Sequence, residues 1–167
     1  GIEDALKCFS QLDKKGHFQF WIIGRAETEK YGAKILKITN QLNFQSKVKF
    51  WGFVSQEKKF ELLSKTHLLI NSSIHEGWGL VNIEANSVGT PVVAFKSAGL
   101  IDSIEEGVSG IFSKEKNPKS LAETIYNLLT DRAYLAKMNK TSVVWSKQFS
   151  WEKAKKQSLK LIEKVSS

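Results

Sequence analysis

The sequence contains little cysteine or proline and no long run of apolar residues. Cys8 is the only cysteine among 167 residues, so no disulfide can form within the chain and a reducing environment is expected. Apolar runs such as residues 20–23 and 68–70 are far too short to cross a bilayer, and the first residues show no signal-peptide pattern. The sequence therefore predicts a cytoplasmic protein, with peripheral contact at the inner face of a membrane left open.

The sequence also lacks the usual metal-binding patterns. His17, His67 and His75 have no metal-ligand spacing with one another or with Cys8. There is no Asp-x-Asp pair, which argues against an enzyme that holds a diphosphate through a divalent cation. We therefore expect no metal and no cofactor.

Positive charge is what the chain has in excess. The formal net charge is +8 and the pI is near 9.5, which suits nucleotides, nucleic acid or acidic lipid head groups. The basic residues are spread along predicted helices and do not gather with exposed aromatic residues, so we expect no nucleic-acid partner.

Short β-like runs alternate with longer helical ones, which is typical of a parallel sheet with crossover helices. Strands are predicted at residues 18–23, 48–50, 67–71, 91–95 and 110–112. Helices are predicted at residues 2–12, 28–42, 56–64, 80–88 and 100–106, and three more begin near residues 118, 132 and 151. The pattern predicts one α/β domain over residues 1–167, with a Rossmann-like doubly wound parallel sheet and a helical C-terminus. Such a sheet begins with its central strand, whereas this chain begins on a helix, so the first central strand is expected to be missing.

Residues 72–93, SSIHEGWGLVNIEANSVGTPVV, carry the most informative chemistry. They follow a predicted strand, at the end where open α/β sheets bind ligands. Gly77 and Gly79 let the backbone approach a ligand closely, and the helix that begins near Leu80 offers free N–H groups to a diphosphate. The segment is therefore predicted to bind a phosphorylated ligand.

Two glutamates flank this turn. Glu76 lies in the loop and Glu84 lies about one helical turn inside the helix, roughly 6 Å along its axis. Ionised carboxylates only accept hydrogen bonds, so beside a diphosphate they suit the hydroxyl groups of ribose and a hexose. A nucleotide sugar satisfies every part of this arrangement. The alternative, an exposed loop acid and a helix-stabilising acid, explains the charges but not their joint position with the glycines.

The segment also resembles the E-x7-E signature of glycosyltransferase family 4, whose members are retaining enzymes of the GT-B fold. Residues 48–54 (VKFWGFV), 98–112 (AGLIDSIEEGVSGIF) and 149–152 (FSWE) resemble the segments that accompany that signature. The resemblance implies the C-terminal, donor-binding half of an enzyme that transfers a hexose from a UDP- or GDP-linked sugar, such as GDP-mannose, in polysaccharide biosynthesis or a related pathway.

Site residues follow from the resemblance position by position. It implies that Glu76 contacts the transferred sugar near the reacting carbon and that Glu84 binds the ribose hydroxyls. The remaining implied donor-binding residues are Gly77, Trp78, Gly79, Leu80, His75, Arg25, Gly24, Gly52, Phe53 and Val54. Trp78 serves equally well to pack the loop, and His75 as an ordinary loop residue.

The chain departs from the family in what it lacks. The family's cationic phosphate contacts and its acceptor-binding domain are expected outside these residues, so an acceptor glycan or lipid would bind through a missing N-terminal domain. Residues 150–167 form a basic amphipathic segment that would cross to that domain or contact a membrane surface. The isolated chain is therefore expected to bind donor but to transfer sugar weakly or not at all. The alternative is a non-catalytic nucleotide-sugar-binding module that acts with a partner chain.

Overall fold

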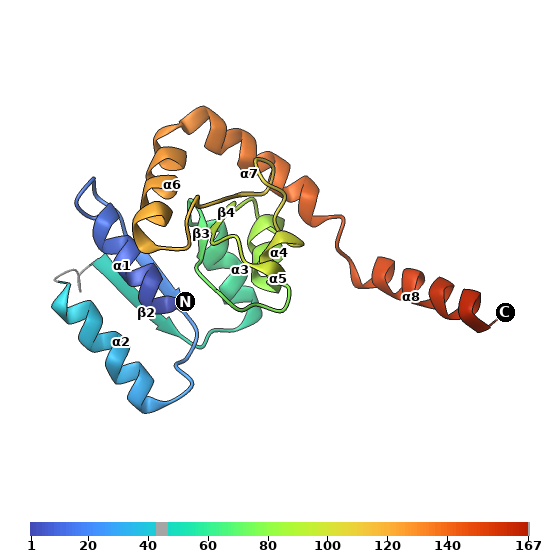
Figure 1. Ribbon diagram of the computed structural model, residues 1–167, viewed down its shortest axis with the longest axis horizontal. Helices are drawn as coiled ribbons and strands as arrows, with labels where there is room; N and C mark the ends of the chain where they lie inside the picture. The colour runs from blue at the N-terminus through green and yellow to red at the C-terminus, as the bar shows by residue number, and fades with distance from the viewer. Residues whose placement is uncertain (43–46, 167) are drawn as a thin grey trace.

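Parallel strands alternate with helices along the chain in the computed structural model, which describes residues 1–42 and 47–166 (Figure 1). The strands are β1 (Phe20–Ile23), β2 (Val48–Gly52), β3 (Leu69–Asn71), β4 (Val92–Ala94) and β5 (Gly110–Phe112). The helices are α1 (Ile2–Leu12), α2 (Glu29–Gln41), α3 (Gln56–Ser64), α4 (Leu80–Ser87), α5 (Ala98–Ile101), α6 (Pro118–Thr130), α7 (Arg132–Ser146) and α8 (Trp151–Ser166). The predicted α/β class, with parallel strands and a helical C-terminus, is confirmed.

The strands form two separate sheets. β1 pairs with β2, and β3, β4 and β5 form a second sheet in that order, with every pairing parallel. Between β1 and β3 lies a cavity of about 560 Å³, lined by residues of both strands and by apolar side chains of α1 and α6. In a sheet of order 3-2-1-4-5-6 this is the place of the first strand, which is the strand predicted to be missing.

Helix α1 holds the two sheets together. Its Leu6 and Phe9 pack with Val48 in a core cluster over the β1–β2 sheet. Its Cys8 and Leu12 belong to a second cluster that contains residues of β4, α6 and α7. Burial raises the pKa of the Cys8 thiol to about 12, so the thiol is protonated and unreactive at neutral pH.

The strands are shorter than predicted at residues 18–23, 67–71 and 91–95. β4 begins at Val92 because Pro91 has no N–H to donate to a neighbour. β3 begins at Leu69, whose N–H donates to the Pro91 carbonyl at 2.8 Å. β1 begins at Phe20, which is paired with the first residue of β2.

The helix predicted at residues 100–106 was wrong in position and length. The observed α5 covers Ala98–Ile101 and follows Ser97, which is fully buried. The chain then turns, because the Ser109 hydroxyl accepts from the Glu105 N–H at 2.9 Å and Gly107 has a φ of 78°. The Glu105 N–H is therefore bonded to a side chain and does not continue the helical hydrogen-bond pattern.

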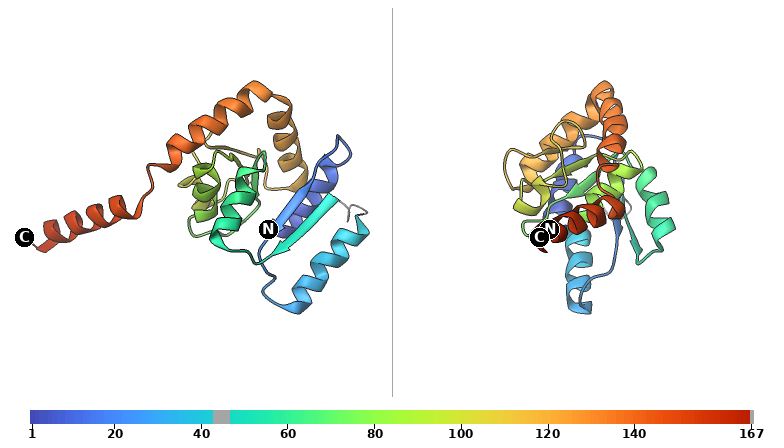
Figure 2. Two further views of the ribbon diagram at one scale, coloured as in Figure 1. Left: turned by 180° about the vertical axis from the view of Figure 1, so that it is seen from behind. Right: turned by 90° about the vertical axis from the view of Figure 1, so that its right-hand side faces the viewer.

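Two of the three C-terminal helices, α6 and α7, pack against the body of the protein, and α8 extends from it. α6 packs against α1, and α7 packs against α4 and α6. α8 extends away from the other elements (Figures 1 and 2), and Trp151 at its start is 86% exposed. Among the described residues, no helix is both long and apolar enough to span a membrane.

Candidate functional site

The segment after β3 is fixed by contacts to two other parts of the chain. The Ser72 hydroxyl donates to the Gly1 carbonyl at 2.7 Å, which places the start of α1 beside the end of β3. The Ser97 hydroxyl, next to α5, donates to the Ser73 carbonyl at 2.7 Å. The loop therefore starts from anchored backbone, although its tip is exposed.

A buried chain of hydrogen bonds supports the helix that follows the loop. The Asn71 amide donates to the Asn82 side-chain oxygen at 3.0 Å, and the Asn82 amide donates to the Ser103 hydroxyl at 2.9 Å. Asn82 and Ser103 are fully buried, so their polar groups need hydrogen-bond partners within the protein. This network fixes α4 relative to β3 and to the turn after α5. The sequence showed these polar residues without indicating that they meet.

The fold requires glycine at only one of the two glycine positions of the turn. Gly79 is the N-cap of α4 with φ 80° and ψ 52°, and a Cβ there would lie 2.7 Å from the Asn82 side-chain nitrogen and 2.8 Å from a methyl of Leu100. Gly77 does not have a positive φ, and a Cβ there would meet nothing within 4 Å. Glycine is therefore required by the fold at position 79, whereas at position 77 the space beside the backbone is open.

Gly99 is a residue of this site that the sequence analysis missed. A Cβ at Gly99 would overlap the carbonyl oxygen of Glu76 and would lie 2.7 Å from that of Gly77. The start of α5 thus packs directly against the backbone of the loop that carries the predicted sugar-binding acid. The sequence around residue 99 does not predict a contact with a loop more than twenty residues earlier.

Glu76 lines a hollow of about 410 Å³ at the loop. The hollow is formed by two short segments, and its lining consists of Ile74, His75, Glu76, Gly77, Ala98 and Gly99. Both His75 and Glu76 are exposed, and a Glu76 carboxylate oxygen accepts from the Gly77 N–H at 3.2 Å. The arrangement offers a carboxylate to a ligand that lies over the loop.

Glu84 does not line that hollow but faces α3. The Lys59 ammonium donates to its carboxylate at 2.6 Å, and both side chains are partly buried. Lys59 was not singled out from the sequence, because only the packing of α3 against α4 brings the two residues together.

The loops after β1 and β2 contact each other. The Gly24 N–H donates to the Gly52 carbonyl at 2.8 Å, and the Arg25 guanidinium lies over the Phe53 ring at 5.1 Å. Phe53 is 72% exposed, and Val54 next to it is partly buried. These four residues and Val54 form one exposed surface at the carboxyl ends of β1 and β2.

Trp78 packs within the protein. Its ring makes an edge contact with Phe149 at 4.9 Å, and Phe149 makes another with Trp145 at 5.1 Å. This is the loop-packing role considered for Trp78. The neighbouring Leu80 is 61% exposed at the start of α4.

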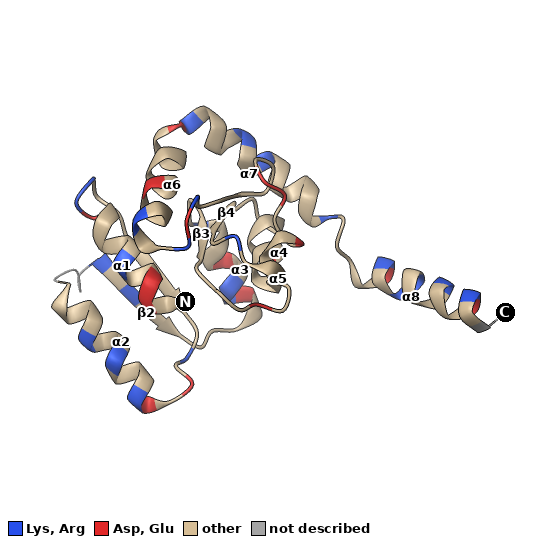
Figure 3. Cartoon of the chain, in the orientation of Figure 1, with Lys and Arg blue, Asp and Glu red and all other residues tan. Residues whose placement is uncertain are grey.

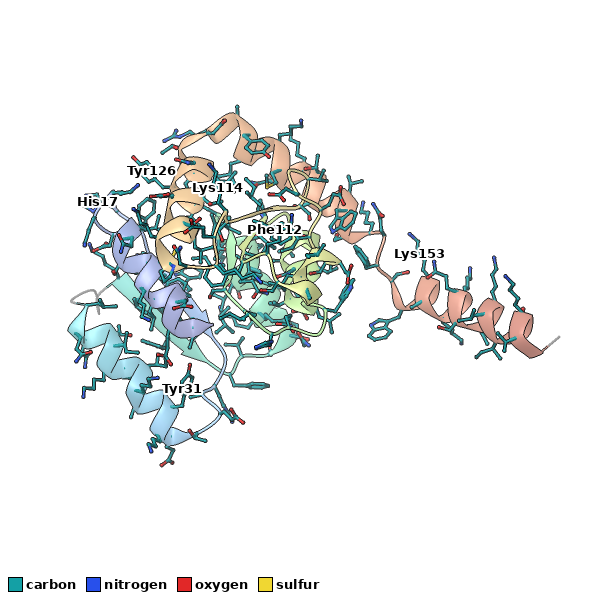
Figure 4. The ribbon with its side chains drawn as sticks, in the orientation of Figure 1. His17, Tyr31, Phe112, Lys114, Tyr126 and Lys153 are labelled. Atoms are coloured by element: carbon teal, nitrogen blue, oxygen red, sulfur yellow. The ribbon has the colours of Figure 1, made fainter. Side chains whose placement is uncertain are left out.

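Charged residues occur on many of the helices. Lys and Arg recur along α2, α7 and α8, while α3 carries both signs close together (Figure 3). At another end of the molecule, Lys15 lies 4.6 Å from the centre of the Tyr126 ring, in the region where Figure 4 labels His17 and Tyr126. Among the described residues, no group of three or more His, Cys, Asp and Glu side chains is arranged to hold a metal ion.

Known proteins share this sequence pattern and fold. The family described as glycosyl transferases group 1 matches residues 1–145. An uncharacterized glycosyltransferase of Methanocaldococcus jannaschii is 28% identical over 162 residues, which is 95% of this chain and 40% of that protein. The chain spans less than half the length of the first curated relatives it matches.

Solved structures show the same fold. HepE from Anabaena, in complex with UDP and glucose, superposes with a TM-score of 0.84 at 22% identity, over 96% of this chain and 44% of that one. Sucrose-phosphate synthase from Thermosynechococcus elongatus gives a TM-score of 0.85 at 22% identity, over 99% of this chain and 43% of that one. The predicted fold, a Rossmann-like C-terminal domain of a GT-B glycosyltransferase, is confirmed by these likenesses. With residues 1–145 matching the family pattern, the chain belongs to the group 1 glycosyl transferases.

Proposed function

We propose that this chain is the donor-binding half of a retaining glycosyltransferase of the family 4 type, which moves a hexose from a nucleoside diphosphate sugar to a glycan or lipid acceptor. The observation that carries the proposal is the Glu76 loop, which leaves β3 at the ligand-binding edge and enters α4 through the left-handed Gly79. Membership of the family, and a structural neighbour crystallised with UDP and glucose, support this assignment.

In this proposal each part of the site binds one part of the donor. The Glu76 carboxylate accepts hydrogen bonds from hydroxyl groups of the sugar, and the Glu84 carboxylate accepts hydrogen bonds from those of the ribose. The N–H groups at the start of α4, with the backbone of Gly77, hold the diphosphate. The surface formed by Gly24, Arg25, Gly52, Phe53 and Val54 borders the base. The helix dipole stabilises the leaving diphosphate, so no metal is needed and a chelator should leave donor binding unchanged.

Calorimetry with UDP-glucose and UDP tests the two carboxylates separately. Glu84→Gln should weaken the binding of both ligands by a similar factor, because both contain the ribose. Glu76→Gln should weaken UDP-glucose and leave UDP nearly unchanged, because only the sugar contacts that residue. Glu123→Gln on α6 is the matched control, since Glu123 is exposed and lies outside the site.

Two outcomes of these binding measurements would contradict the proposal. Equal affinities for the wild type and Glu84→Gln would refute the ribose role. A thermal-shift comparison of UDP-sugars with GDP-sugars identifies the base, and a failure to bind any of them would refute donor binding.

The acceptor is proposed to bind outside these residues, and α8 to pack against that part of the enzyme. α8 extends from the body, with exposed Leu161, Ile162 and Val165. A chain that binds donor without turnover, and that gains turnover when an acceptor-binding domain is added, would support an enzyme half. Binding with no turnover in any combination would favour a non-catalytic module.

A further inference from the structure

The ion pair between Lys59 and Glu84 differs from the surface pairs of the same helix. It joins α3 to α4, and the two side chains are only 22% and 28% exposed. Lys58, one residue earlier, pairs with Glu61 within α3 at 2.8 Å, with both side chains more than 40% exposed. The Lys59–Glu84 pair is therefore less screened by water, and its charges act more strongly on whatever lies nearby.

The geometry of this pair leaves half of the carboxylate available. Lys59 occupies Oε1 of Glu84, and Oε2 has no hydrogen-bond partner among the described residues. An ionised carboxylate offers about four lone-pair positions on its two oxygens. Glu84 can therefore accept from a ligand hydroxyl while it keeps the ammonium of Lys59.

The charge of the pair matters because of where Glu84 lies. It is the fifth residue of α4, roughly 6 Å along the axis from the helix start that would hold a diphosphate. An uncompensated carboxylate at about 7 Å from a phosphate would weaken binding about three- to sevenfold for each unit of phosphate charge, at effective dielectric constants of about 80 to 40. Lys59 removes this repulsion by making the pair neutral.

We propose that Lys59 cancels the charge of Glu84 beside the diphosphate while it leaves Glu84 free to accept hydrogen bonds from the ribose hydroxyls. This inference rests on the proposed function, because it assigns a role to a neighbour of the proposed ribose-binding acid. It makes a specific claim about ligand chemistry: Lys59 matters for a phosphorylated nucleoside and hardly at all for a neutral one.

The test is calorimetry of the purified protein with UDP and with uridine. With at least two units of charge on its diphosphate, UDP should bind about nine- to fiftyfold more weakly to Lys59→Met at low salt, and this loss should shrink at high salt. The affinity for uridine should change by less than about twofold. Lys59→Arg should restore UDP affinity, since it keeps the charge. Lys58→Met is the matched control, because it removes the same charge from the same helix without touching Glu84.

The variants separate this role from two others. If Lys59 competed with the ribose for Glu84, Lys59→Met would tighten UDP and uridine alike, which overturns the proposal. If the pair only joined α3 to α4, Lys59→Met would lower thermal stability and weaken both ligands equally, which also overturns it. Equal UDP affinities in the wild type and Lys59→Met would refute this inference and leave the proposed function standing. A wild type that binds neither UDP nor GDP would refute both.

A double-mutant cycle adds a second readout. In a Glu84→Gln background Lys59 is an uncompensated cation beside the diphosphate, so Lys59→Met should weaken UDP binding by about the same factor as in the wild type, because Coulomb energies add. A much smaller loss in the Glu84→Gln background would mean that Lys59 acts by holding the Glu84 side chain in place, and it would overturn the charge role.

Discussion

Gly99→Ala should damage the loop that carries Glu76 while leaving the strands in place. The added methyl would overlap the Glu76 carbonyl and lie 2.7 Å from the Gly77 carbonyl oxygen. Gly99 is buried, and the clashing atoms belong to backbone, which cannot rotate away as the end of a flexible side chain can. The loop must therefore shift by about 1 Å or more. Overpacking of this kind costs about 1 to 3 kcal/mol.

That cost translates into measurable changes. For a chain of this size it lowers the melting temperature by about 2 to 12 °C. A shift of about 1 Å in a positioning group can cost up to about a hundredfold in rate, so transfer by an enzyme containing this chain should fall about ten- to a hundredfold. Thermal melts and donor titrations of the variant measure the two effects.

The control is the same chemical change in an open place. Gly32 lies inside α2, where a Cβ would make only an ordinary contact at 3.4 Å with Ala26, so Gly32→Ala should stabilise the protein slightly. A Gly99→Ala protein with wild-type melting temperature and wild-type donor affinity would refute the packing argument.

Three further outcomes are expected. Asn82→Ala should lower the free energy of unfolding by about 2 to 4 kcal/mol in urea titrations, because the Asn71 amide loses its acceptor and the buried Ser103 hydroxyl loses its donor. A loss below about 0.5 kcal/mol would contradict this. Cys8, with its pKa near 12, should resist a thiol reagent at pH 8 until the protein unfolds, and rapid labelling of the native protein would contradict its burial. Adding a five-residue apolar segment and a short loop ahead of Gly1 should raise the melting temperature and slow amide exchange in β1 and β3. The control is the same added segment with proline at alternate positions, which cannot pair as a strand. Equal effects of the two segments would count against strand insertion.

Helix boundaries were predictable where a side chain caps the helix, because that signal is local, whereas α5 was predicted at the wrong residues. Thr28, Ser55 and Asn117 each accept a hydrogen bond from a backbone N–H three residues later, as expected of N-caps. Ser150 does the same for α8. Strand ends were less predictable because a strand ends where its partner ends, and the partner is set by the whole sheet.

The residues of the candidate site that were predicted from the sequence are mostly contiguous. His75 to Leu80 form one continuous segment, and the αL conformation at Gly79 was not predicted. Lys59 and Gly99 could not be found in this way, since each acts by contact with an element far away in the chain. The sequence also offered no means to distinguish the structural role of Gly79 from the open space at Gly77.

The cavity between the sheets and the candidate site depend on the same region of the fold. A strand inserted between β1 and β3 would be parallel to both, because each already pairs in parallel with its other neighbour. Its carboxyl end would therefore emerge at the edge where Ser72 contacts Gly1. Such a strand would give the unpaired edges of β1 and β3 their partners, and the loop that follows it would reach the start of α4. Joining the sheets and completing the phosphate contacts would thus be two consequences of one structural change, and a protein with that strand should gain stability and donor affinity together.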